Sequence, residues 1–180
     1  MNTFYLDMDG VVADWEQAVA NFFGEDTPRT KFVNGHYKNT DIEWRMLREQ
    51  ERFYRDLPLM IQSPELVSLA REYRDQLGWH LKFLTAVPKN DDMPWAFYDK
   101  VIWAVKYFPD IPVMFGPHST DKYKHCQKGD ILVDDRLDNC QAWTQAGGIS
   151  YCVTDNDLSW AIDQVRLDLN SRRIESLLQE

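Results

Sequence analysis

The chain has 180 residues, of which 44% are hydrophobic and 13% aromatic, which is enough for one folded domain with a small insertion. Its formal net charge of −9 at pH 7 argues against stable binding of nucleic acid through the phosphate backbone, because such binding needs a basic surface. A small anionic substrate is compatible with this charge, since one cation and a few local donors can outweigh the field of the whole protein.

The sequence predicts a protein of a reducing compartment. No run of about 18 apolar residues is present, so we expect no membrane span. The N-terminus lacks the basic and apolar regions of a signal peptide, so we expect a cytoplasmic protein. The cysteines Cys126, Cys140 and Cys152 are odd in number and form no CxxC pair, which predicts free thiols.

Five short apolar segments are predicted to be strands. They alternate with helical patterns, which is typical of an α/β fold with a Rossmann-like parallel sheet. In chain order the segments are residues 3–6, 81–84, 112–115, 131–133 and 149–153.

Helical patterns occupy the intervening segments. Apolar residues between 15 and 23 recur at helical spacing, with Asp14 as the N-cap. A helix is expected to begin at Pro94, with one apolar face formed by Tyr98, Val101, Ile102 and Val105. Residues 158–178 predict a long amphipathic helix with a potential break at residue 170.

One segment interrupts the alternation of strands and helices. Residues 22–77 are polar, aromatic and helical in pattern, especially residues 41–55. We therefore expect a small helical cap at 17–77, inserted after the first strand, and a core domain made of 1–16 and 78–180. The cap is expected over the carboxyl edge of the sheet, where parallel sheets bind ligands.

Polar residues follow three of the predicted strands. Asp7 and Asp9 follow the first, Thr85 the second, and Asp134 and Asp135 the fourth. Because parallel strands end at one edge of a sheet, we expect these side chains to converge. The glycine after Asp9 permits a sharp turn of the backbone there.

Four converging carboxylates require a cation, since like charges destabilise one another. Oxygen ligands of this kind favour Mg²⁺, which also binds substrate phosphates, and an aspartate can attack phosphorus to form an aspartyl-phosphate. Each motif alone has an ordinary explanation: Asp-x-Asp is common, Asp134 and Asp135 suit a helix cap, and Thr85 suits a turn. Their joint order after three apolar strands favours the catalytic interpretation.

These motifs carry a family resemblance. Asp7-Met-Asp-Gly-Val-Val-Ala-Asp14, Leu84-Thr85 and Leu132-Val-Asp-Asp-Arg136 resemble motifs of the haloacid-dehalogenase-like (HAD) phosphatases. Within that superfamily the chain is most similar to the 5′(3′)-deoxyribonucleotidases. The stretches that carry this similarity are residues 7–15, 85–88, 98–108 and 132–139.

The resemblance assigns roles to the acidic residues. It implies that Asp7 is the nucleophile and a metal ligand, and that Asp9 is the general acid/base, with its carbonyl on the metal. It also implies that Asp134 and Asp135 complete the Mg²⁺ site and that the Thr85 hydroxyl binds phosphate.

The resemblance leaves the phosphate-binding lysine open. Lys100 is favoured, and Lys122 and Lys124 are rivals from a later loop, of which Lys124 is taken as the second phosphate-binding candidate. The alternative for Lys122 and Lys124 is a solvated loop, since most lysines lie at the surface. The chain departs from the subgroup at Ala86, which replaces a small hydroxyl residue, and in a slightly longer loop over 88–100.

Aromatic residues are the candidates for binding a nucleobase. Trp15 lies where the subgroup turns an aromatic residue toward the substrate, and Trp44 is a weaker candidate in the cap. Stacking has a physical basis, since every base presents a π-face. The alternative is that Trp15 only packs the first helix, and that Trp44, like the other weak candidates Phe53 and Tyr54, only packs the core.

The sequence thus predicts a Mg²⁺-dependent phosphatase of (deoxy)nucleoside monophosphates. A HAD phosphatase for a phosphosugar or a polynucleotide 3′-phosphate is the alternative, and a phosphoacceptor receiver domain is a remote one. The expected partner is a small nucleotide, without a membrane or stable nucleic-acid partner, and association as a homodimer is left open.

Overall fold

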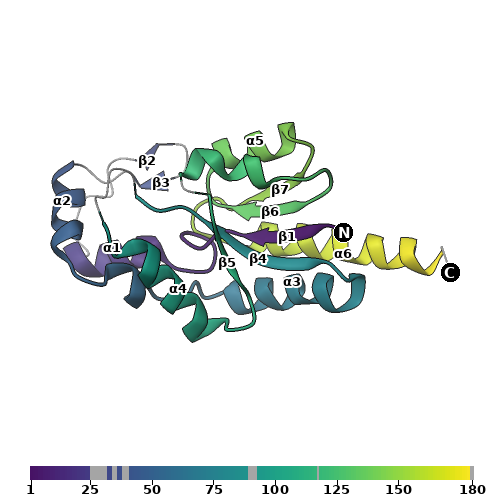
Figure 1. Ribbon diagram of the computed structural model, residues 1–180, viewed down its shortest axis with the longest axis horizontal. Helices are drawn as coiled ribbons and strands as arrows, with labels where there is room; N and C mark the ends of the chain where they lie inside the picture. Colours follow the sequence, from purple (N-terminus) through teal and green to yellow (C-terminus); the bar gives the residue numbers. More distant parts are fainter. Residues whose placement is uncertain (25–31, 34–35, 38–40, 89–92, 117, 179–180) are drawn as a thin grey trace.

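The computed structural model describes residues 1–24, 32–33, 36–37, 41–88, 93–116 and 118–178. Its centre is a five-stranded parallel sheet in the order β5-β4-β1-β6-β7 (Figure 1). The prediction of an α/β fold with a parallel sheet is therefore confirmed. The strands are β1 (Thr3–Leu6), β4 (His80–Thr85), β5 (Val113–Phe115), β6 (Ile131–Asp134) and β7 (Ile149–Cys152).

Alternation along the strands divides the core between the two faces of the sheet. On one face Leu6 and Phe83 pack with α3 (Ser63–Leu77), α6 (Ser159–Leu177) and Trp103 of α4 (Ala96–Tyr107). On the other face Tyr5 packs with Trp143 of α5 (Leu137–Gln145). Both faces are covered, which explains why the strands are apolar throughout rather than alternating.

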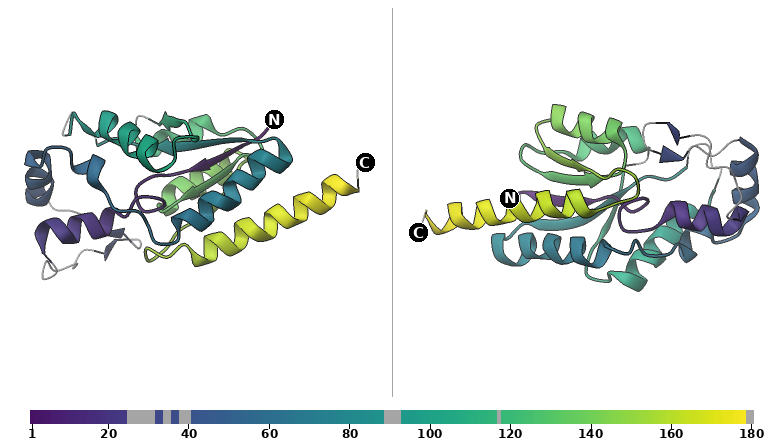
Figure 2. Two further views of the ribbon diagram at one scale, coloured as in Figure 1. Left: turned by 90° about the horizontal axis from the view of Figure 1, so that it is seen from below. Right: turned by 180° about the vertical axis from the view of Figure 1, so that it is seen from behind.

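Helices α3 and α6 lie side by side on the sheet (Figure 2). The Tyr73 hydroxyl of α3 donates a hydrogen bond to Asp168 Oδ2 of α6 at 2.6 Å. Helix α6 is continuous through residue 170, so the potential break there is absent. Because α3 packs on β4 and α6, the range 17–77 expected for the cap includes one helix of the core layers.

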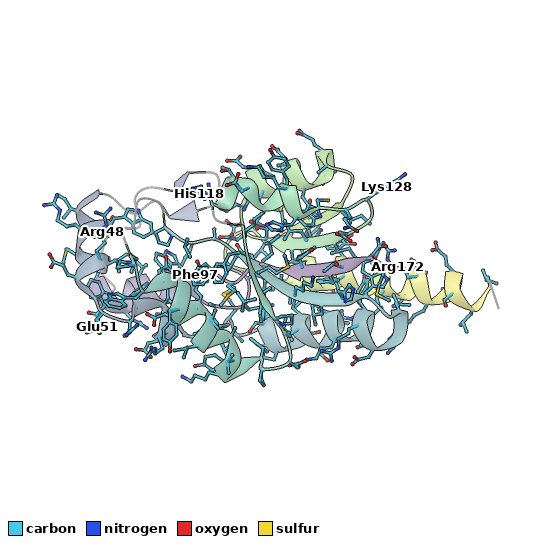
Figure 3. The ribbon with its side chains drawn as sticks, viewed as in Figure 1. Arg48, Glu51, Phe97, His118, Lys128 and Arg172 are labelled. Atoms are coloured by element: carbon cyan, nitrogen blue, oxygen red, sulfur yellow. The ribbon has the colours of Figure 1, made fainter. Side chains whose placement is uncertain are left out.

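The remaining inserted elements lie beyond the carboxyl edge of the sheet (Figure 1). Asp14 caps α1 as predicted, since its side chain accepts a hydrogen bond from the Gln17 amide at 2.9 Å. A short antiparallel strand pair was not predicted. Figure 3 shows Arg48 and Glu51 at the outer end of this region. Its elements are α1 (Trp15–Phe23), β2 (Phe32–Val33), β3 (His36–Tyr37), α2 (Asp41–Glu49) and the 3₁₀ helix η1 (Phe53–Asp56).

The apolar face predicted for α4 was wrong. Tyr98 and Val105 are 59% and 60% exposed, whereas Asp99, Lys100 and Trp103 are buried. The buried face is tied to the segment around η1: the Trp103 indole donates to the Leu57 carbonyl at 2.8 Å. Hydrogen bonding and ion pairing, rather than hydrophobicity alone, therefore set the orientation of this helix.

Two expectations about compartment can be compared with the structure. Within the described ranges, no helix combines the length and apolar character that crossing a membrane requires. Cys126, Cys140 and Cys152 are free thiols, as predicted.

Candidate active site

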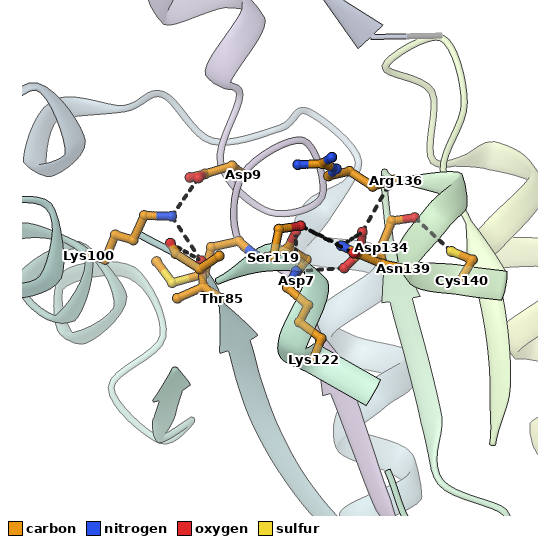
Figure 4. Close-up of polar contacts among 12 residues, drawn as sticks. Asp7, Asp9, Thr85, Lys100, Ser119, Lys122, Asp134, Arg136, Asn139 and Cys140 are labelled. Atoms are coloured by element: carbon orange, nitrogen blue, oxygen red, sulfur yellow. Dashed lines mark hydrogen bonds and ion pairs between the residues drawn. The ribbon is translucent and has the colours of Figure 1, made fainter. Parts of the chain in front are cut away.

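Three adjacent strands deliver polar side chains to one place (Figure 4). Asp7 follows β1 directly, Thr85 ends β4 and Asp134 ends β6, and β1 lies between the other two strands. All three residues are at least 95% buried, with Asp7 5% exposed, Thr85 1% and Asp134 0%. The predicted convergence of these residues is therefore present.

A tight turn after β1 holds Asp7 in place. The Asp7 amide donates to the Val133 carbonyl at 2.9 Å, which continues the sheet, and the Met8 amide donates to Asp7 Oδ1 at 2.7 Å. Gly10 has φ +73°, and a Cβ there would lie 2.5 Å from Asp135 Oδ2. Glycine is thus required both by the backbone conformation and by the approach of Asp135.

Asp7, Asp134 and Asp135 can hold a metal ion. One carboxylate oxygen from each lies within 4.8 Å of the other two. Asp134 Oδ1 accepts hydrogen bonds from the Arg136 amide and from Asn139 Nδ2, each at 2.9 Å, and these fix its orientation. Such a set of hard oxygen donors fits Mg²⁺.

Burial and mutual repulsion disfavour the ionised form of these carboxylates. Burial raises the pKa of Asp134, and the neighbouring charge of Asp7 adds to this, while Lys122 opposes it. The pKa of Asp135 is raised well above its usual range by burial and then by the charges of Asp134 and Asp7. Each carboxyl group is therefore more easily ionised once a positive charge joins it.

Lys122, rather than Lys124, supplies a positive charge to this cluster. It lies on the 3₁₀ helix η2 (Ser119–His125), and its Nζ is 2.6 Å from Asp7 Oδ2 and 2.6 Å from Asp134 Oδ2. Burial alone would lower the pKa of Lys122, but the two carboxylates outweigh it and the pKa is raised. The Lys124 side chain is 60% exposed and pairs with Asp121.

Lys100 links a second group of site residues. Its Nζ donates to Asp9 Oδ2 at 2.5 Å and to Thr85 Oγ1 at 2.9 Å, so the structure brings these three predicted residues together. Burial raises the pKa of Asp9, Lys100 lowers it, and the charge of Asp7 raises it, with a net increase. Asp9 Oδ1 is buried without a hydrogen-bond partner among the described residues, so it is available to a substrate group.

An aromatic cluster adjoins Lys100. The Lys100 ammonium lies 4.8 Å from the centroid of the Tyr54 ring, and Tyr54 stacks on Trp15 with centroids 5.2 Å apart. Trp15 also contacts Trp44 and Phe53, at centroid distances of 5.7 and 5.1 Å. Both predicted tryptophans are half-buried in this cluster, which extends from the polar site into the inserted region.

Three contributors were missed or ranked too low from the sequence. Asn139 orients Asp134, and its place one helical turn after the Asp-Asp pair was a usable signal. Tyr54 forms the contact between the aromatic cluster and Lys100, and from the sequence it was only a weak candidate for which core packing was favoured. Lys122 and Lys124 stand two residues apart in one polar loop, and only the 3₁₀ turn decides which of them is buried.

A family model matches this arrangement of motifs over nearly the whole chain. The model describes the "5′ nucleotidase, deoxy (Pyrimidine), cytosolic type C protein" family and matches residues 2–168. The chain belongs to this family. The resemblance to the HAD-like phosphatases and to the deoxyribonucleotidases among them is thereby confirmed, and the family member described here is a hydrolase. No match was found among curated proteins.

Solved structures that resemble this chain share little sequence identity with it. A hydrolase from Pseudomonas syringae is 13% identical, with 92% of this chain and 90% of that chain covered and a TM-score of 0.47. A hydrolase from Streptococcus pneumoniae TIGR4 is 15% identical, with 85% and 92% covered and a TM-score of 0.49. A HAD family enzyme from Bacteroides thetaiotaomicron, in complex with magnesium and inorganic phosphate, is 15% identical, with 87% and 96% covered and a TM-score of 0.47.

Proposed function

We propose that this chain is a Mg²⁺-dependent phosphatase that hydrolyses (deoxy)nucleoside monophosphates through an aspartyl-phosphate on Asp7. The proposal rests on the family and on one structural relationship. Lys100 contacts Asp9 and Thr85 on one side. On the other side it contacts Tyr54, which stacks on Trp15. This contact supports a phosphate site that would adjoin aromatic rings able to stack on a planar base.

Asp7 is the proposed nucleophile. Its Oδ1 accepts the Met8 amide at 2.7 Å, which fixes the carboxylate, and Oδ2 faces Lys122 and the metal-binding residues. An oriented carboxylate can attack phosphorus in line with the leaving sugar oxygen. The side chain is buried, so few waters compete for this position.

Asp9 is the proposed acid and base. In its protonated form it would donate a proton to the leaving oxygen, and as the carboxylate it would take a proton from the water that cleaves the aspartyl-phosphate. A pKa raised by burial makes Asp9 a weaker acid than an exposed aspartate, so its acid form persists to higher pH, and the unpartnered Oδ1 is the atom that would exchange the proton. Lys100 and Thr85 would hold the equatorial phosphoryl oxygens.

Bound Mg²⁺ would neutralise the carboxylates and increase the electrophilicity of phosphorus. Asp7, Asp134 and Asp135 are the residues that would hold it, and the Asp9 carbonyl is a further ligand implied by the family resemblance. Asn139 and the Arg136 amide would keep Asp134 oriented toward the ion.

A phosphatase for a phosphosugar or a polynucleotide 3′-phosphate is the second candidate. The motifs shared by HAD phosphatases are compatible with all of these substrates, since specificity lies outside them. The half-buried rings of Trp15 and Trp44 favour a substrate that carries a base, and the net charge of −9 disfavours a polynucleotide.

A substrate panel tests the proposal. Phosphate release would be measured from 5′- and 3′-monophosphates of deoxy- and ribonucleosides, from ribose 5-phosphate and from a 3′-phosphorylated oligonucleotide, each with Mg²⁺ and with a chelator. We expect Mg²⁺-dependent release, with the highest kcat/KM on a nucleoside monophosphate. Comparable kcat/KM on ribose 5-phosphate would refute the nucleotidase assignment and leave the phosphatase chemistry intact.

A further inference from the structure

Two cysteines flank the backbone of Asp134 on the side away from Asp7. Cys152 is the last residue of β7 and pairs with Asp134 in the sheet register. Cys140 lies in the second turn of α5, and its thiol donates to the Asp134 carbonyl at 3.6 Å (Figure 4). Both sulfur atoms therefore belong to residues packed directly against a proposed metal ligand.

The two thiols lie in the same space between α5 and β7. Ser150 Oγ of β7 donates to the Cys140 carbonyl of α5 at 2.9 Å, so the face of β7 that carries Ser150 is turned toward α5. Cys152 is two residues further along β7 and therefore points to the same face. Cys140 is only 4% exposed, while Cys152 is half-buried, so Cys152 is the thiol that a small oxidant reaches first.

We propose that Cys140 and Cys152 form a redox modification site, in which a hydroperoxide converts the two thiols into an intramolecular disulfide. The Cys152 sulfur attacks the peroxide oxygen, the O–O bond breaks, and Cys152 becomes a sulfenic acid while hydrogen peroxide leaves as water. The Cys140 sulfur then attacks the Cys152 sulfur and displaces a second water. In total two thiols lose two hydrogens, and one hydrogen peroxide is reduced to two waters.

Oxidation would be transmitted to Asp134. A disulfide fixes the two sulfurs about 2.05 Å apart and so constrains how the start of α5 sits against the end of β7. The Cys140 thiol would also lose the proton that it donates to the Asp134 carbonyl. The adjacent Asn139, which orients Asp134 Oδ1, moves with the same turn of α5. The disulfide is therefore expected to weaken binding of a divalent cation at Asp134. A resulting loss of activity rests on the proposed function.

Cys126 provides the matched control. It is partly exposed, its thiol contacts the Trp143 carbonyl at 3.7 Å, and burial raises its pKa to about 11. It serves to separate oxidation of the pair from general oxidation of cysteine.

The first experiment tests whether the disulfide forms. The full chain and its Cys126→Ser, Cys140→Ser and Cys152→Ser variants would be treated with hydrogen peroxide and analysed by intact mass and peptide mapping. We expect a Cys140–Cys152 disulfide in the wild type and in Cys126→Ser, and in neither of the other variants. Cys140→Ser should stop at a Cys152 sulfenic acid that dimedone traps. Absence of the disulfide in the folded wild type, or linkage through Cys126, would overturn the proposal.

The second experiment tests whether the disulfide weakens the binding of Mg²⁺. The increase in Tm caused by Mg²⁺ would be compared between reduced and oxidised protein, and again after dithiothreitol. We expect a smaller increase after oxidation, recovery on reduction, and no effect of peroxide in Cys152→Ser. An unchanged increase despite a complete disulfide would refute the link to the metal site. Neither readout involves nucleotides, so failure of the substrate assignment would not affect them.

Discussion

A single buried ammonium group, Lys122 Nζ, bridges Asp7 Oδ2 and Asp134 Oδ2 at 2.6 Å each. The lysine thereby compensates two carboxylates that belong to different strands and that Mg²⁺ would also bind. Lys122 and a metal ion compete in part for the same negative charge. We therefore expect the folded protein to need a positive charge beside these two carboxylates, from either Lys122 or a bound metal ion.

Replacing Lys122 with methionine should therefore destabilise the protein without Mg²⁺. Removing one partner of a buried ion pair costs about 3–5 kcal/mol, because the remaining charge is buried without compensation. Denaturant unfolding in the presence of a chelator would measure this loss, and Mg²⁺ should restore more stability to Lys122→Met than to the wild type. Lys124→Met is the matched control and should stay within about 0.5 kcal/mol of the wild type. Equal effects of the two substitutions would contradict the bridging role.

Asp7 and Asp9 should have separable roles in turnover. Asp7→Asn removes the nucleophile and should abolish both phosphate release and formation of a phosphoenzyme. Asp9→Asn should slow formation of the phosphoenzyme but also slow its hydrolysis, so that acid-stable label accumulates from ³²P-labelled substrate. Substantial turnover by Asp7→Asn would show that another group attacks phosphorus.

Lys100 should control the pH dependence of the first chemical step. The pKa of Asp9 is raised by burial, and Lys100 opposes this increase, so kcat/KM is expected to fall as the pH rises through that pKa. Lys100→Met removes the opposing charge, so the pKa of Asp9 should rise and the alkaline limb of the profile should move to higher pH. The maximal rate should also fall by about 10²–10³, because a donor to the phosphoryl group is lost.

The control for Lys100 lies on the same helix. Lys106 is exposed near the end of α4, and Lys106→Met should leave both the rate and the profile unchanged. An alkaline limb that stays in place or moves to lower pH in Lys100→Met would argue against Asp9 as the proton donor.

Trp15 should matter only for substrates that carry a base. Loss of base stacking costs about 1–3 kcal/mol, so Trp15→Leu should raise KM for a nucleoside monophosphate by about tenfold with a smaller change in kcat. The rate on ribose 5-phosphate should not change. Trp160→Leu, at a tryptophan that is 55% exposed on α6, is the control. An equal loss on both substrates would assign Trp15 to packing alone.

The contact between α4 and the segment around η1 depends on Asp99. Asp99 is 1% exposed and pairs with Arg52 Nη1 at 3.2 Å and Arg55 Nη2 at 3.3 Å. Asp99→Ala should lower the free energy of unfolding by about 1–3 kcal/mol, because both guanidinium groups lose a buried acceptor. The control is Asp163→Ala, since Asp163 is 65% exposed in its pair with Arg166 and should change stability by less than about 1 kcal/mol. Equal losses in the two variants would contradict this role of Asp99.

The sequence alone determined the parallel sheet and the residues at its carboxyl edge. Apolar strands that end in Asp7, Thr85 and Asp134 can only be buried in a covered sheet, and parallel strands bring their ends together. The cap on α1 by Asp14 was equally readable, because a capping side chain acts within one turn of its own helix.

Only the tertiary structure decided which side chains enter the site from outside the sheet. Lys122 and Lys124 have the same chemistry and differ by two positions, so their burial depends on how η2 sits against Asp7 and Asp134. Helix α4 turns Lys100 inward and exposes Tyr98, because contacts with Asp9 and Tyr54 outweigh the burial of one apolar face. Such long-range pairings leave no periodic pattern in the sequence. That is the physical reason why only the family resemblance pointed to Lys100, and why nothing in the sequence separated Lys122 from Lys124.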